Sequence, residues 1–214
     1  MLLDHLIIYR HLTKDADVEK CLSFIEDESL LNEEDFIATM LTLAERYDLH
    51  GHLFQSLLTY LLAHHENSFT LSLERKQPIS EALKEVIMND LQMLYQMYHF
   101  DFSKLNPLYK DLFIDFPHSK PIINQEIYDL LTKLQIMLSK STSVAEFYEI
   151  LYNHYRQYGV GKYGLNKAFR YLDNEIIPIE HIGNNTLEQL IGYESQKERL
   201  KANTEAFLNG RKAN

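Results

Sequence analysis

The feature that most constrains this chain is the helical spacing of its apolar residues. Across residues 36–47 they recur at positions i, i+4, i+7, i+8 and i+11, which places them on one face of a helix. Similar spacing returns at residues 87–98 and again at 123–138. Each apolar stripe requires a partner that buries it. The sequence therefore predicts an all-α fold, a multi-helix domain.

Residues typical of helix ends support this interpretation. Asn32, followed by three acidic residues, predicts a capped helix start. Ser143 and Glu146 match a capping box, and Gly159 stands where that helix would end. The apolar run at residues 53–63 predicts one further helix, with histidines at both of its ends.

Strand signals are few, and they mark a change in organisation. Isoleucines at positions 176–182 favour a short strand, but Pro178 among them indicates an edge strand or an extended linker. We expect a long connection near residues 101–121, where prolines cluster, and a domain linker near 173–185. The predicted domains are residues 1–172 and 173–214.

Charge and composition exclude several classes of protein. The formal net charge of −10 opposes general attraction to nucleic acid or to anionic lipid. Residues 194–214 nevertheless carry five basic and three acidic side chains, so the acidity belongs to the rest of the chain. No apolar run approaches the roughly 20 residues of a membrane span, and no signal peptide is apparent. With one cysteine, the chain is expected to be cytoplasmic.

Two groups of residues invite a chemical function that the sequence does not support. His50, His52, His64 and His65 could bind a metal, but one helix between the two pairs would separate His52 from His64 by roughly 18 Å. We therefore predict no metal site. Cys21 lies in a helical stretch, where a lone thiol is typically a packing residue. No catalytic residue is predicted.

A basic–aromatic segment at residues 152–171 is the most distinctive local composition. It contains four basic residues, no acidic residue and six aromatic residues: Arg156, Lys162, Lys167, Arg170, Tyr152, Tyr155, Tyr158, Tyr163, Phe169 and Tyr171. Its Gly161-Lys162-Tyr163 is not a phosphate-binding loop, because Arg156 and Tyr163 replace the required Gly and Ser/Thr. The segment could bind single-stranded nucleic acid. The favoured alternative is a docking face, with tyrosines packed between helices and cations that pair with the acidic part of the chain.

The last thirty residues carry a family resemblance. Thr186–Leu200, with its Leu-Ile-Gly-x-Glu turn, and Asn203–Asn214 resemble the approach to the phosphate-binding loop of AAA+ ATPases. The sequence resembles one group in particular, an uncharacterised bacterial AAA+ family of predicted ATP-binding proteins with a long helical region before the core. Tyr158–Arg170 and Leu3–Arg10 look similar to that family as well.

The sequence Asn184-Asn185-Thr186 matches a glycosylation acceptor, but we reject that role. We expect Thr186 to cap the next helix instead, with Gln189 completing a capping box.

The resemblance implies a division of labour between this chain and a longer protein. The chain would be a non-catalytic helical recognition or regulatory region, followed by a linker and by the first helix leading into an AAA+ core. Ile191, Gly192 and Tyr193 would flank the adenine of ATP, whereas the remaining ATP- and Mg²⁺-binding residues would lie beyond Asn214. No cofactor is therefore expected on this chain alone, and the chain itself is not expected to be an enzyme.

The resemblance also implies partners, one of which would cover the apolar side chains of the last helix. The reading frame is expected to continue into a strand and a G-x-x-x-x-G-K-S/T loop, the AAA+ core that would be the first partner. A helix at Thr186–Leu208, stopped by Gly210, would otherwise lack a cover for Leu200, Phe207 and Leu208. A protein partner is also expected. Alternatives are a stand-alone helical adaptor, or single-stranded nucleic-acid binding through residues 152–171.

Overall fold

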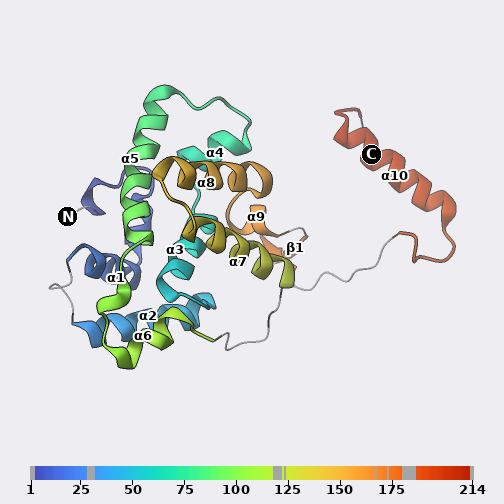
Figure 1. Cartoon of the computed structure of the whole chain (residues 1–214). Helices are drawn as coiled ribbons and strands as arrows, with labels where there is room; N and C mark the ends of the chain where they lie inside the picture. Colours follow the sequence, from blue (N-terminus) through green and yellow to red (C-terminus); the bar gives the residue numbers. More distant parts are fainter. Residues whose placement is uncertain are drawn as a thin grey trace. The chain divides into compact units, whose positions relative to one another are not determined.

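The computed structural model describes residues 3–27, 32–117, 122, 124–166, 168–172, 174–179 and 187–212. The chain divides into two compact units, Met1–Glu180 and His181–Asn214. The described part is mostly helical, as the sequence predicts, and Figure 1 shows its elements in chain order.

The first unit contains short 3₁₀ helices, α-helices and one hairpin. Its elements are η1 Leu3–His5, η2 Arg10–Lys14, α1 Ala16–Glu26, α2 Glu33–Tyr47, α3 Leu53–His64, α4 Ser68–Glu74, α5 Glu81–Tyr98, η3 Phe102–Lys104, α6 Pro107–Ile114, α7 Gln125–Ser139, α8 Val144–Tyr158, α9 Gly161–Leu165, β1 Phe169–Leu172 and β2 Glu175–Pro178. The predicted stripes near residues 36–47, 53–63 and 87–98 therefore lie on α2, α3 and α5, and that at 123–138 lies largely on α7.

Helix α3 lies at the centre of the core. It packs against α2, α5, α6, α7 and α9, and its Phe54, Leu57 and Leu58 are fully buried. Aromatic side chains fill the side near α6, where the ring of Phe36 stacks on Phe24 with centroids 4.1 Å apart. This shared burial supplies the partner that each apolar stripe requires. Within the described residues, no helix is long and apolar enough to cross a membrane.

A buried carboxylate fixes the N-terminal segment to α5. Asp90 is fully buried, and its carboxylate accepts backbone N–H bonds from Ile7, Ile8 and Tyr9 at 2.7–3.1 Å. A buried charge is tolerated when several donors surround it in this way. Asp90 therefore links two segments about eighty residues apart in the sequence, and no sequence pattern indicates this contact.

The helix starts confirm two predictions and correct a detail. The side chain of Asn32 accepts the N–H of Asp35 at 2.7 Å, and that of Ser143 accepts the N–H of Glu146. The capping box at Ser143 is only half formed, because the Glu146 carboxylate accepts instead from the backbone and hydroxyl of Thr142. The preceding turn brings Thr142 into reach, and its hydroxyl adds a second donor.

The predicted long connection at residues 101–121 is wrong over much of its length. Helix α6 lies within it, capped by Asn106, with Pro107 in the first turn and Phe113 buried in the core. Proline is compatible with the first turn of a helix, because its missing N–H would have no partner there. The cluster of prolines therefore marks a helix start as well as loops.

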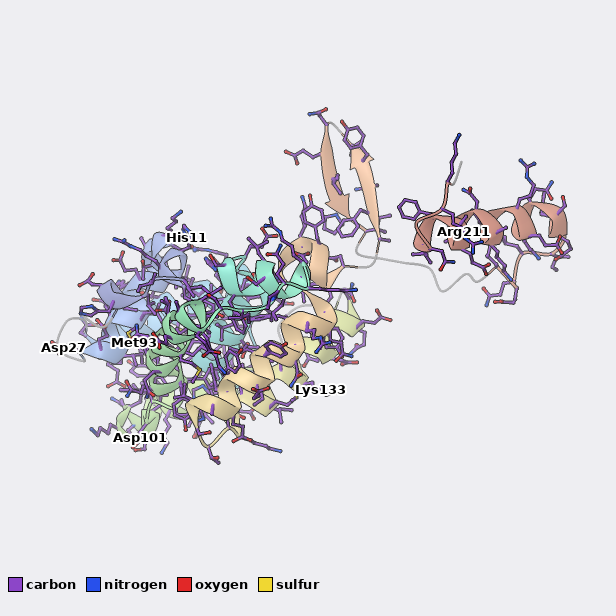
Figure 2. The ribbon with its side chains drawn as sticks, turned by 90° about the horizontal axis from the view of Figure 1, so that it is seen from above. His11, Asp27, Met93, Asp101, Lys133 and Arg211 are labelled. Atoms are coloured by element: carbon purple, nitrogen blue, oxygen red, sulfur yellow. The ribbon has the colours of Figure 1, made fainter. Side chains whose placement is uncertain are left out.

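The first residues of the isoleucine-rich run, Ile176 to Pro178, lie in the second strand of a two-stranded hairpin. β2 pairs antiparallel with β1, with Phe169 opposite Pro178 and Leu172 opposite Glu175. The sequence leaves an edge strand and a linker open, and the structure shows the strand. It follows that the linker predicted from residue 173 does not include β2, and that an all-α description omits this small sheet. In Figure 2 the two strands extend beyond the helices of their unit.

The described part of the second unit contains a turn and one helix. Residues 187–189 form a turn, and α10 spans Glu194–Leu208. The helix predicted from Thr186 thus begins later than expected. Thr186 itself lies outside the described residues, whereas Tyr193, in the left-handed conformation, precedes α10 without a capping side chain. Gly210, with φ of 67°, follows the end of α10 as predicted.

Candidate functional site

The basic–aromatic segment contributes one wall of a hollow in the first unit, which we call the α8 hollow. Tyr152, Tyr155, Arg156 and Gly159 are spaced i, i+3, i+4 and i+7 along α8 and its C-terminal cap, so they share one face. The end of α4 and the loop after it, residues 73–78, form the opposite wall. The hollow has a volume of about 760 Å³, which is within the usual range for small-ligand sites of roughly 300–1,000 Å³.

Two of the residues that line the α8 hollow, Gly159 and Gly164, are in close contact. A Cβ on Gly164 would lie 2.5 Å from the carbonyl carbon of Gly159 and 2.8 Å from the carbonyl oxygen of Tyr158. Gly159 and Gly161 also adopt positive φ angles of 72° and 64°. These glycines allow α9 to turn back tightly on the end of α8. The resemblance of this run to a phosphate loop is therefore explained by packing.

Tyr155 is a structural residue of this hollow. Its hydroxyl donates to the carbonyl of Leu62 at 3.1 Å and lies 3.2 Å from the hydroxyl of Tyr9. Burial raises the pKa of Tyr155 well above its ordinary value. The docking interpretation of the tyrosines is correct for this residue, because its ring and hydroxyl are both used within the core.

The remaining side chains of the segment differ from Tyr155 in exposure. Tyr152 and Tyr158 are half-buried, Tyr163 is 52% exposed, and Arg156 is exposed. Lys76 adds a second cation from the opposite wall, and Glu74 is the acidic residue of the lining. Within the described residues, neither Arg156 nor Lys76 forms an ion pair. The docking interpretation expects the cations of the basic–aromatic segment to pair with the acidic part of the chain, and no such pair to Arg156 occurs among the described residues.

The second predicted site is the turn that precedes α10. Ile191 is 95% exposed and Tyr193 is 71% exposed. Gly192 has a φ of 84°, and a Cβ added to it would have no other atom within 4 Å. The three residues predicted to flank adenine are thus consecutive and open to solvent. The turn itself contains no basic side chain, and what it presents is the apolar side chain of Ile191 and the ring of Tyr193.

The four histidines lie where the predicted helix places them. His52 caps the start of α3, and His64 is its last residue. His50 stacks on Tyr128, and His64 stacks on Tyr60, so the rings are used in packing. Burial lowers the pKa of His52 to about 4. No group of three or more metal-binding side chains occurs within the described part of the chain.

Cys21 is a packing residue, as predicted. It is fully buried on α1, and burial raises the pKa of its thiol to about 12. The thiolate, which is the reactive form, is therefore strongly disfavoured near neutral pH.

Sequence reasoning missed the wall of the α8 hollow that comes from the α4–α5 loop. Lys76, Gln77 and Pro78 are about 80 residues from Arg156 in the sequence, and no periodicity connects them. The one local signal is a polar stretch ending in proline, which is typical of any loop. Lys76 adopts a positive φ of 54°, and its N–H donates to the carbonyl of Leu73.

Comparison with known proteins gives one finding. The model of a family described as a protein of unknown function (DUF815) matches residues 165–214. This range covers the end of α9, the hairpin, the exposed turn and α10. No curated protein and no solved structure matches the chain. The match therefore covers the segment that carries Ile191, Gly192 and Tyr193, and most of the first unit lies outside it.

Proposed function

We propose that the chain is a non-catalytic recognition or regulatory region of an AAA+ ATP-binding protein, in which ATP binding and hydrolysis require a longer chain. The observation that carries this proposal is the exposure of the apolar side chains on α10. Phe207 is 73% exposed, Leu208 is 76% exposed, and α10 has no buried residue. By contrast, each α-helix of the first unit buries side chains.

The apolar residues of α10 are arranged for a partner. Leu200, Phe207 and Leu208 are spaced i, i+7 and i+8, which places them on one helix face. Covering them would stabilise the helix by about 1.5–3 kcal/mol for each fully buried side chain. A lone helix of this length is marginal in water, since its nucleation is costly. A following domain that packs on this face would supply the missing stability.

Two further features support an AAA+ core as that partner. The Leu190-Ile191-Gly192 turn and the helix after it resemble the lead-in to such a core. The turn also leaves Ile191 and Tyr193 accessible, as contact with an adenine ring would require. ATP and Mg²⁺ are the cofactors that the longer protein would bind.

The chain alone is not proposed to be an enzyme. Phosphoryl transfer requires groups that hold the β- and γ-phosphates and Mg²⁺. The sequence contains no G-x-x-x-x-G-K-S/T loop, and the turn offers adenine contact alone. Such contact without phosphate binding would give weak affinity for ATP.

Calorimetric titration of two chains with ATP and Mg²⁺ tests this proposal. One is the 214-residue chain, and the other extends through the next domain encoded downstream. For the first chain we expect a dissociation constant for ATP no lower than about 1 mM. For the second chain we expect a dissociation constant at least a hundredfold lower. Ile191→Ala should weaken binding by the longer chain, whereas Leu108→Ala, an exposed change on α6, should not.

Three results would contradict the proposal. Low-micromolar affinity of the 214-residue chain would demand a separate ATP site. A downstream sequence without a phosphate-binding loop would remove the AAA+ core, and a stop codon directly after Asn214 would favour the stand-alone adaptor.

A further inference from the structure

We propose that the α8 hollow and the adjoining hairpin bind single-stranded nucleic acid. This inference goes beyond the proposed function and does not depend on it, because all the residues involved belong to the first unit. It rests on a row of aromatic rings of which Tyr163 and Tyr171 are exposed, on cations that form no ion pair within the described residues, and on a hollow that can receive a base.

The aromatic row begins in the hollow and continues onto the hairpin. Tyr158 lines the hollow, and Tyr163 lies at its rim. The ring centroid of Tyr163 is 5.4 Å from that of Phe169, the first residue of β1. Alternation along the strand places Tyr171 on the same face as Phe169. Tyr171 is 71% exposed, so a core role does not explain its ring.

The cations interleave with these rings. Arg156 and Lys76 line the hollow from its two walls, while Lys162 and Arg170 are exposed next to Tyr163 and Tyr171. Lys162 lies with its ammonium 5.3 Å from the centre of the Tyr163 ring. No ion pair to Arg156, Lys162 or Arg170 occurs within the described residues. Phosphates could therefore contact them without displacing a carboxylate partner.

Among the described residues, the charge around the row is basic; Lys167, Asp173 and Glu180 lie outside them. Glu74 lines the hollow, and Glu175 lies on β2 opposite Leu172 rather than opposite an aromatic residue. This composition differs from that of the whole chain, whose net charge is −10. A local basic patch on an acidic protein confines phosphate binding to that patch, because the overall charge opposes general attraction.

The geometry favours single strands over duplexes. Rings stack on bases only when the base faces are free, and a duplex covers those faces. The hollow is large enough for one base to enter beside Arg156, and the rings of Tyr163, Phe169 and Tyr171 can take the bases that follow. Sequence preference would be weak, since every base has a face that stacks.

Fluorescence anisotropy with the 214-residue chain tests the proposal. The probes are labelled oligothymidine and oligouridine of about 12 nucleotides, a blunt duplex of the same length, and inorganic phosphate and ATP as competitors. We expect binding of both single strands, at least tenfold weaker binding of the duplex, and little competition by phosphate or ATP at equal nucleotide concentration.

The variants separate stacking from charge. Tyr163→Ala should weaken binding of the single strands about tenfold, and Tyr163→Phe should restore it, because stacking needs the ring but not the hydroxyl. Arg156→Gln should make the dependence of log affinity on log salt shallower by about 0.7, the value for one lost phosphate contact. Arg10→Gln, which replaces an exposed arginine on η2, is the charge-matched control. It should change neither the affinity for single strands nor the salt dependence of that affinity.

The proposal is overturned by no binding of single strands, by equal affinity for single strands and duplex, or by loss of affinity in Arg10→Gln equal to that in Arg156→Gln. Competition by ATP alone at low micromolar concentration would also overturn it, because the hollow would then be a mononucleotide site. Circular dichroism of each variant confirms that the helices remain folded.

Discussion

Helices α8 and α10 have the same length, 15 residues, and opposite environments. α8 begins at a serine cap and buries five side chains, including Phe147 and Leu151. α10 begins after a left-handed tyrosine without a capping side chain, and it buries none. Both are followed by a glycine with positive φ. A glycine stop therefore marks where a helix ends, but it does not show whether the helix is packed.

This difference has an energetic meaning. Most of the stability of a helix in a protein comes from the burial of its apolar face, and propensity alone leaves short helices marginal. α8 obtains that burial from α4, α5 and α7. α10 carries an apolar face that no described residue of its own unit buries. The two helices should thus respond differently to the same kind of substitution.

The largest difference is expected for matched phenylalanine substitutions. Phe147→Ala removes a fully buried ring on α8 and should lower the free energy of unfolding by about 3–5 kcal/mol. Phe207→Ala removes an exposed ring on α10 and should change it by less than about 0.5 kcal/mol. Urea unfolding followed by circular dichroism measures both. Equal losses would show that α10 is packed.

Matched glycine substitutions should give a smaller contrast. Gly164→Ala forces a Cβ against the backbone of Gly159 and should cost about 1–3 kcal/mol. Gly210→Ala strains only the end of α10 and should leave the main unfolding transition within about 0.5 kcal/mol. Thermal unfolding compares the two. If Gly164→Ala unfolds like the parent chain, the close approach of α9 to α8 is wrong.

Acid should destabilise the unit that contains α8, through His154. Burial lowers the pKa of His154 to about 4, below the ordinary value of 6.5. The unfolded chain therefore binds more protons between these values, and stability is lost as pH falls from about 6.5 to about 4. The contribution of His154 between pH 7 and pH 5 should be about 1–2 kcal/mol.

The control for this prediction is His154→Gln, which cannot titrate in that range. Its unfolding free energy should fall less steeply between pH 7 and pH 5 than that of the parent chain. His52, whose pKa burial also lowers to about 4, contributes equally to both proteins and cancels in the comparison. Parallel pH profiles of the two proteins would mean that His154 has the same pKa in the folded and in the unfolded chain. α10 contains no histidine, so its helix signal should not follow this profile.

The smallest contrast concerns helix starts. Ser143→Ala removes the acceptor for the Glu146 N–H and should cost about 1 kcal/mol. Ser195→Ala, in the first turn of α10, removes a hydroxyl whose contact is the side chain of Gln196, and its effect on unfolding should be near zero. Chemical unfolding with both variants measured side by side resolves this difference. A cost at Ser195 equal to that at Ser143 would contradict the comparison.

The sequence predicts most of the helical fold because periodicity and caps are local. The Asn32 and Ser143 starts, the helix between the histidines and the glycine after α8 all follow from neighbouring residues. The sequence predicts only one strand of the β1–β2 hairpin. Ile176 and Ile177 favour β2, whereas the residues of β1 belong to the basic–aromatic segment and are not predicted as a strand. Helix α6 is missed because Pro107 looks like a loop residue.

The candidate sites show the limit of local reasoning more clearly. The sequence identifies Arg156 and Tyr163, but the α8 hollow also needs Lys76, which tertiary packing alone brings near them. The buried contacts of Asp90 are equally invisible, because backbone donors leave no mark in a sequence. Ile191, Gly192 and Tyr193 are consecutive, so their common turn needs no tertiary information.

Hydrogen exchange of backbone amides tests most directly the claim that α10 is stable only when a partner covers its apolar face. In the 214-residue chain, the amides of α8 should show opening free energies close to that of global unfolding, while those of α10 should exchange almost as fast as an unstructured peptide. In the chain extended through the downstream domain, α10 should gain strong protection. Protection of α10 equal to that of α8 in the shorter chain would contradict the account.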